Sequence, residues 1–158
     1  MIACRGEKKR KLATEKPTNL SLPPFVKSAS IARPGVLALA VDDWVDYPSE
    51  KMKIENLSRQ LAHCNLDDIA MIVLTDDDKF LGATLNNFLW VTFTRANPSH
   101  DIYGVNARTE FKHWGCDGPL IIDARIKKHH APVLKKDPKV VAKVDRLFGK
   151  GGELYGVV

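Results

Sequence analysis

Three consecutive carboxylates, Asp76, Asp77 and Asp78, follow Thr75 at the end of the apolar segment 69–74, which has the pattern of a buried strand. Carboxylates at the end of a strand can bind Mg²⁺, and a strand followed by Asp-x-Asp also opens some Mg²⁺-dependent phosphatases. Those enzymes need a second acidic pair after another strand, whereas Asp123 stands alone. We therefore favour a solvated turn in which one aspartate caps backbone amides. An independent Mg²⁺-dependent, phosphatase-like enzyme that uses Asp76 and Asp78 is the alternative.

A second polar cluster follows the apolar segment 119–122. Within this cluster, the adjacent residues His129 and His130 would point in opposite directions in an extended chain, so they form a poor metal pair on their own. The basic side chains around them could hold a phosphate or an acidic neighbour. A plain exposed loop fits them equally well. They are Arg125, Lys127, Lys128, Lys135 and Lys136.

The sequence predicts no catalytic residue in this chain. It contains no Gly-x-Ser-x-Gly elbow for a nucleophilic serine, no Gly-x-Gly-x-x-Gly fingerprint and no P-loop. Cys116 lies between Gly115 and Asp117, and we interpret it as a buried or incidental cysteine. The chemistry open to this chain is therefore binding or positioning.

The net charge of +5 is concentrated at the start of the chain. Residues 1–16 carry a balance of +4, and the remaining residues are close to neutral at +1. A basic tail can bind nucleic acid or an acidic partner. We favour a solvated arm instead and expect no nucleic-acid partner. The six basic residues are Arg5, Lys8, Lys9, Arg10, Lys11 and Lys16.

Cysteine usage and hydropathy indicate the compartment. The three cysteines, Cys4, Cys64 and Cys116, are widely spaced and odd in number, which favours a reducing cytoplasm over a disulfide framework. No apolar run approaches the ~18 residues of a membrane span, and the basic start is not followed by the apolar region of a secretory signal. We expect a cytoplasmic protein.

The order of apolar segments predicts an α/β fold with one three-layer domain, in which helices flank a mainly parallel sheet. Strands are expected at 36–41, 69–74, 102–105, 109–114 and 119–123, and helices from Ser49, at 84–95 and from Pro138 to Gly149. Residues 1–34 contain four prolines and show no clear periodicity, so they are predicted to form an extended basic arm. The domain then comprises residues 35–158.

Two of the predicted helices have an apolar side that should pack on the sheet. In the helix at 84–95 this side consists of Leu85, Phe88, Leu89 and Phe93, with Trp90 pointing elsewhere. The last helix has Val140, Val141, Val144, Leu147 and Phe148 on one side. Arg95 and Asp101 bracket the turn at Asn97-Pro98, and we expect them to form an ion pair.

Residues 35–130 resemble the C-terminal domain of UbiD-type decarboxylases. The family pattern is an acidic VDDDID turn, a helix with Trp-Ala-x-x-Thr-Arg, then Asp-Pro-x-x-Asp and Leu-Asp-Ala-Thr-x-Lys. This chain departs from it at Lys79, Asn97 and Arg125. The C-terminal segment of the chain and the loop after Lys127 look most like the branch of the family that acts on phenylphosphate or similar aromatics. The matching segments are 73–78, 85–95, 97–101 and 122–127.

The resemblance implies a role rather than a reaction for this chain. Family members bind prenylated FMN with a divalent metal and K⁺, and their acid/base residues lie in a preceding domain that has no counterpart here. The resemblance thus implies a small, non-catalytic subunit that assists assembly and covers the active site of a larger UbiD-type subunit, within a homo- or hetero-oligomer. It implies a cofactor contact at Lys127. The expected partner interface comprises Trp90, Arg95, Asp101, Lys128, His129 and His130.

Overall fold

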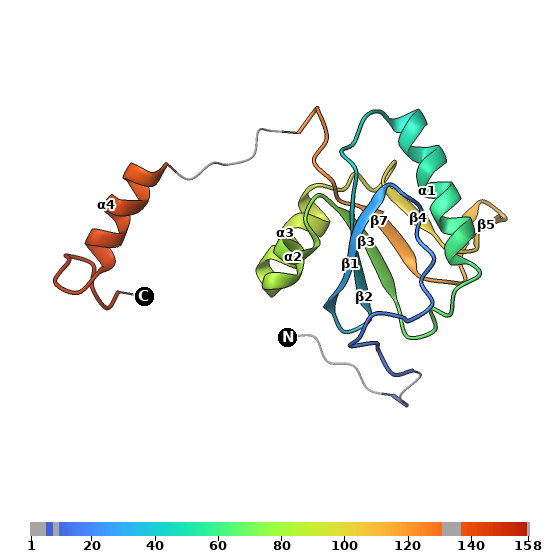
Figure 1. Ribbon diagram of the computed structural model, residues 1–158, viewed down its shortest axis with the longest axis horizontal. Helices are drawn as coiled ribbons and strands as arrows, with labels where there is room; N and C mark the ends of the chain where they lie inside the picture. The colour runs from blue at the N-terminus through green and yellow to red at the C-terminus, as the bar shows by residue number, and fades with distance from the viewer. Residues whose placement is uncertain (1–5, 8–9, 131–136, 158) are drawn as a thin grey trace.

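A computed structural model describes residues 6–7, 10–130 and 137–157. Its centre is a five-stranded sheet in the order β1-β2-β3-β7-β4 (Figure 1). The three inner strands run parallel to one another, and both edge strands run antiparallel to their neighbours. The predicted α/β fold is confirmed, with a mixed sheet in which only the central part is parallel. The strands are β1 (Val26–Arg33), β2 (Val36–Val41), β3 (Met71–Thr75), β4 (Ile102–Gly104) and β7 (Leu120–Asp123).

Helices cover both faces of this sheet. Because side chains alternate along a strand, Leu37 and Leu39 face one side while Ala38 faces the other. The first face packs against α1 (Tyr47–Leu61). The second packs against α2 (Asp78–Ala83) and α3 (Leu85–Thr94), on the opposite side of the sheet in Figure 1. The central strands are therefore buried on both faces, which explains their continuous apolar sequences.

The predicted arm at 1–34 is wrong for residues 26–33, which form the edge strand β1. The chain before β1 is also attached to the domain. The Ala13 amide donates to the Asp68 carbonyl at 2.9 Å, and Leu22 and Phe25 pack on the core beneath α1. Serines, an arginine and two register irregularities hide the alternation of this edge strand from sequence analysis. Arg5, Lys8 and Lys9 lie outside the described residues.

Two of the three predicted helix starts have the predicted caps. The Thr84 hydroxyl accepts from the Asn87 amide at 3.0 Å at the start of α3. Asp137 caps α4 (Pro138–Phe148), which ends at Gly149 as predicted. Helix α1 begins at Tyr47, two residues before Ser49, because Asp46 is its cap.

Two short elements differ from the expectation. Helix α2 occupies a segment for which the sequence predicts no element, and Asp77 caps it by accepting from the Phe80 amide at 2.9 Å. The strand expected at 109–114 is instead a separate hairpin of β5 (Ala107–Glu110) and β6 (His113–Cys116). Both elements are too short to give a periodic signal.

The apolar side predicted for α3 is only partly correct. Phe88 packs in the core, but Leu85, Leu89 and Phe93 are exposed, and the other buried residues are Val91 and Thr92. Six of the ten residues in this helix are apolar, so they surround it and periodicity cannot select the buried side. Four of the five residues on the predicted apolar side of α4 are exposed and Leu147 is partly buried, and Figure 1 shows α4 apart from the sheet.

Substitutions in α3 test this orientation. Phe88 is 9% exposed and Phe93 is 58% exposed on the same helix. We expect Phe88→Ala to lower the free energy of unfolding by about 3–5 kcal/mol, since it leaves a cavity. Phe93→Ala should cost less than about 1 kcal/mol. Urea denaturation measures both, and equal costs would show that α3 is turned differently.

Candidate functional site

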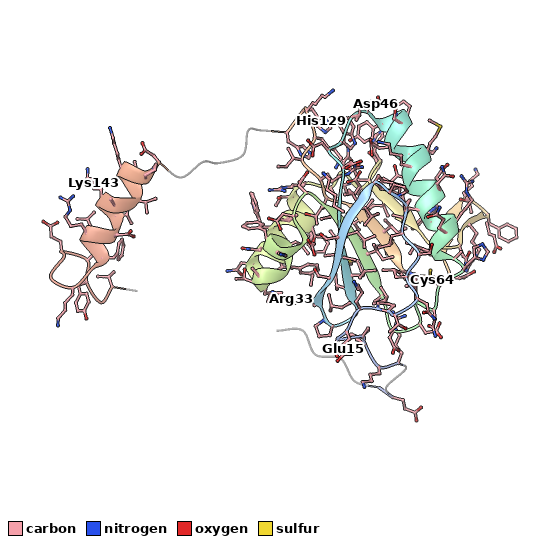
Figure 2. All side chains as sticks on the ribbon, viewed as in Figure 1. Glu15, Arg33, Asp46, Cys64, His129 and Lys143 are labelled. Carbon is pink, nitrogen blue, oxygen red and sulfur yellow. The ribbon has the colours of Figure 1, made fainter. Side chains whose placement is uncertain are left out.

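Charged side chains meet at the carboxyl edge of the parallel strands, where α/β proteins place their functional groups. Asp76 follows β3, and Asp123 ends β7. The loop after β7 passes over this edge, so that His129 and Asp46 lie at the same end of the domain in Figure 2. We call the buried charged residues of this edge the charge network: Glu50, Asp101, Asp123, Arg125 and Lys127.

Arg125 is the centre of the charge network. Its guanidinium donates two hydrogen bonds to the Asp123 carboxylate, from Nε at 2.9 Å and from Nη2 at 2.7 Å. Its Nη1 lies 2.8 Å from a carboxylate oxygen of Glu50 on α1 and donates to the Asp42 carbonyl at 2.9 Å. Burial alone would lower the pKa of Arg125, but Asp123 and Glu50 outweigh it and raise that pKa. One side chain thus joins β7, α1 and the end of β2.

Lys127 holds the loop that follows. Its ammonium lies 3.3 Å from Asp101 and donates to the carbonyls of Arg95, Asp123 and Arg125 at 3.3, 2.9 and 3.3 Å. An ammonium has three N–H donors, and these four acceptors already occupy them. The side chain is also buried. Lys127 therefore does not fit the predicted contact to a cofactor and instead fixes the backbone.

The predicted pair between Arg95 and Asp101 is wrong. Asp101 pairs with Lys127 and also accepts from the Asn97 amide at 2.7 Å, which closes the turn after α3. Arg95 pairs with Asp76 at 3.2 Å, and its guanidinium carbon lies 5.0 Å from the centre of the Trp90 ring. Charge sign allowed either pairing, and the fold selects the partner.

All three aspartates of the acidic turn have structural partners. Asp76 accepts from the Ile126 amide at 2.9 Å in addition to its pair with Arg95. Asp77 caps α2, and Asp78 accepts from the Ser28 hydroxyl at 2.7 Å. In residues 6–7, 10–130 and 137–157, no three His, Cys, Asp or Glu side chains gather as metal ligands. One aspartate, Asp77, is a cap as predicted, but the turn is not solvated throughout because Asp78 is buried.

An aromatic cluster lies beside the charge network. The Tyr47 ring centre is 5.1 Å from Trp44, 4.9 Å from His100 and 6.0 Å from His129, and His129 is 4.8 Å from His130. The His130 Nδ1 accepts from the Lys127 amide at 3.1 Å. Burial, followed by the charge of Lys127, lowers the pKa of His130. This ring therefore stays neutral at neutral pH.

The predicted interface residues divide into two groups. Trp90, Lys128 and His129 are exposed and can touch another molecule, and His130 is partly exposed. Asp101 is buried and Arg95 nearly so, and both hold the exposed residues in place. Sequence analysis missed Trp44, Tyr47 and Glu50. The polar loop after strand 36–41 could have revealed the first two, but Glu50 has no distinguishing signal in a helix.

The residues that carried the family resemblance converge at this edge. Segments 73–78, 85–95, 97–101 and 122–127 supply Asp76, Trp90, Arg95, Asp101 and Lys127, which form linked contacts. Their shared effect is to fix the backbone at 95–101 and 124–130. This arrangement is suited to presenting a rigid surface, because its buried carboxylates and cations bind one another.

Comparison with known proteins confirms the resemblance to decarboxylases. The chain is 29% identical over 84 residues to a 4-hydroxybenzoate decarboxylase subunit of Chlamydia pneumoniae, covering 53% of this chain and 14% of that protein. It is 26% identical over 95 residues to an uncharacterized protein of Chlamydia caviae, covering 60% of this chain and 16% of the relative. The chain thus spans a small part of the relatives it matches. No family model matches it.

Among solved structures, the vanillic acid decarboxylase of Sedimentibacter hydroxybenzoicus in its open form is similar. The identity is 12% and the TM-score 0.47, covering 80% of this chain and 30% of that one. A second structure of that enzyme, in a truncated form, gives 13% identity and a TM-score of 0.42. These distant likenesses carry no functional argument. Within the described residues, no helix has the length and apolar character to cross a membrane.

Asp101→Asn tests the charge network, because it removes the charge opposite Lys127 while keeping the size of the side chain. An unpaired buried ammonium is costly, so we expect a loss of about 3–5 kcal/mol in unfolding free energy. Glu110→Gln is the control, since the Arg108–Glu110 pair is exposed and should contribute at most about 1 kcal/mol. A loss in Asp101→Asn as small as in the control would contradict the network.

The lowered pKa of His130 predicts a pH dependence. A histidine whose pKa is lowered in the folded protein binds protons more readily in the unfolded chain. Its contribution to the free energy of unfolding is therefore complete above the unfolded pKa of ~6.5 and is lost as the pH falls below that value. Wild type should lose stability between about pH 7 and pH 5. His130→Asn should reduce that loss, whereas His113→Asn on the exposed β6 should not. Identical pH profiles for wild type and His130→Asn in urea titrations would refute the assignment.

Proposed function

We propose that this chain acts as a small, non-catalytic subunit or domain of a UbiD-type aromatic acid carboxylase or decarboxylase. In this proposal it supports assembly and covers the active site of a larger subunit, which carries prenylated FMN, a divalent metal and K⁺. The similarity to a 4-hydroxybenzoate decarboxylase subunit supports the coarse assignment. We further propose a cytoplasmic location, from the cysteine usage.

The observation that carries the proposal is an exposed apolar surface whose tryptophan is held by motif residues. The outer side of α2 and α3 presents five large apolar side chains to solvent, and Trp90 is 49% exposed. Contiguous apolar surfaces of this kind mark sites of association. We call this surface the α3 face; it consists of Phe80, Leu85, Leu89, Trp90 and Phe93.

Trp90 is positioned as an interface anchor would be. Arg95 lies against its ring at 5.0 Å, and the Asp76 carboxylate fixes Arg95 at 3.2 Å. A tryptophan restrained before binding loses little rotamer freedom when it binds, and tryptophan and arginine are enriched among the residues that dominate binding energy. The charge network supports this surface because Lys127 holds the Arg95 carbonyl.

The exposed apolar side of α4 supports the same role. An isolated helix of 11 residues is only marginally stable in water, so burial of its apolar side would stabilise it. A larger subunit could cover both this side and the α3 face. The two alternatives lack such support: the aspartates of the Mg²⁺ alternative have protein partners, and Arg5, Lys8 and Lys9 of the nucleic-acid alternative lie outside the described residues.

Association with a larger UbiD-type subunit tests the proposal. Candidate large subunits from the same genome are co-expressed with the chain in a host that makes prenylated FMN, and complexes are identified by size-exclusion chromatography and native mass spectrometry. We expect a complex in which decarboxylation by the large subunit depends on this chain. Trp90→Ala should weaken the complex at least about tenfold.

Met52→Ala is the control, because Met52 is an apolar residue that is 62% exposed but lies on α1, on the opposite side of the sheet from the α3 face. It should change the affinity less than about twofold. The chain purified alone should carry no flavin and show no decarboxylation. Elution alone in every pairing, or stoichiometric flavin on the isolated chain, would overturn the proposal.

A further inference from the structure

The tip of the β5–β6 hairpin displays an aromatic side chain in a strained backbone. Glu110 pairs with His113, so Phe111 and Lys112 are the two turn residues, and their φ angles are +48° and +68°. Such turns favour Asn-Gly, and a bulky residue in this region is an outlier. Phe111 is also 95% exposed. Neither turn stability nor packing within the domain accounts for a phenylalanine here.

The base of the same hairpin lines a pocket. This pocket has a volume of about 820 Å³ and lies between α1, β4 and the hairpin. Its aromatic lining comes from Tyr47, Tyr103 and Trp114. Burial raises the pKa of Tyr103 to about 12, so its hydroxyl remains a neutral donor at the pocket wall. The size suits an aromatic side chain together with its neighbours.

The charges beside Phe111 and those beside the pocket are complementary. Phe111 is flanked by Glu110 and Lys112. The α1 side of the pocket carries Lys51, Glu55 and Arg59. An inserted hairpin tip could therefore place Lys112 against Glu55 and Glu110 against one of the two cations. Within one copy Glu55 lies 3.9 Å from Lys51 and Glu110 lies 3.9 Å from Arg108, in exposed pairs that an inserted tip would exchange for partners in the other copy. The tip and the pocket are thus complementary in the sign of their charges.

From this match we propose that two copies of the chain form a twofold dimer in which Phe111 of each copy enters the pocket of the other. A twofold interface requires a self-complementary surface, and here the projecting residue and part of its receptor lie on the same hairpin. Trp114 of the same hairpin lines the pocket, so the two hairpins lie side by side in the dimer. This inference concerns a surface other than the α3 face and does not rest on the proposed function.

Sedimentation velocity of the full chain, alone and over a wide concentration range, tests the dimer. Wild type should show reversible dimerisation. Phe111→Gly should weaken the dimer at least about tenfold. It should also raise the urea midpoint of the monomer, because glycine adopts positive φ without strain. These opposite effects distinguish a lost contact from a damaged fold.

Charge exchange tests the reciprocal arrangement. Lys112→Glu and Glu55→Lys should each weaken the dimer, and the double variant should restore it to within about threefold of wild type. Lys79→Glu, an exposed change on α2, is the control and should have no effect. A chain that stays monomeric at all concentrations, an unchanged dimer in Phe111→Gly, or a double variant no stronger than the single ones would each overturn the inference.

Discussion

The arrangement at the carboxyl edge depends on the buried guanidinium of Arg125. It forms an ion pair with Glu50 and a two-bond pair with Asp123. Replacing a whole buried ion network by apolar residues can be neutral, whereas removing one member leaves a charge without compensation. Such a network therefore contributes less to overall stability than to selecting one arrangement of β7, α1 and the following loop. The rigidity of the α3 face and of the loop at 126–130 follows from that selection.

The sequence predicted the elements that have strong local signals. Continuous apolar segments identified β2, β3 and β7, and the caps at Thr84 and Asp137 located two helices. Strand β1 was missed because an edge strand buries little of itself, so its apolar pattern is weak. The inward side of α3 was misjudged because Leu89 and Phe93 are as apolar as Phe88. Burial there depends on how the helix meets the sheet.

The candidate site shows the same division between local and long-range information. The sequence singled out the motif residues, and in the structure Lys127 pairs with Asp101 while Asp76 accepts from the neighbouring Ile126 amide. Their partners could not be predicted, because charge alone does not say whether Arg95 pairs with Asp76 or Asp101. Glu50 could not be distinguished from any other helical glutamate. Its burial arises only when α1 packs beside the end of β7.

The central claim is that Arg125 and Lys127 hold the loop after β7 against the sheet edge. Amide hydrogen exchange at Ile126 and Lys127 tests it most directly, since these amides donate to Asp76 and His130 at 2.9 and 3.1 Å. We expect both amides to be protected in wild type. Arg125→Lys keeps the charge but loses the bidentate hydrogen bonding to Asp123. It should accelerate exchange of the Ile126 and Lys127 amides at least about tenfold, while the exchange rate of the Ile72 amide in β3 changes little. Unprotected exchange in wild type, or protection that survives in Arg125→Lys, would contradict this account.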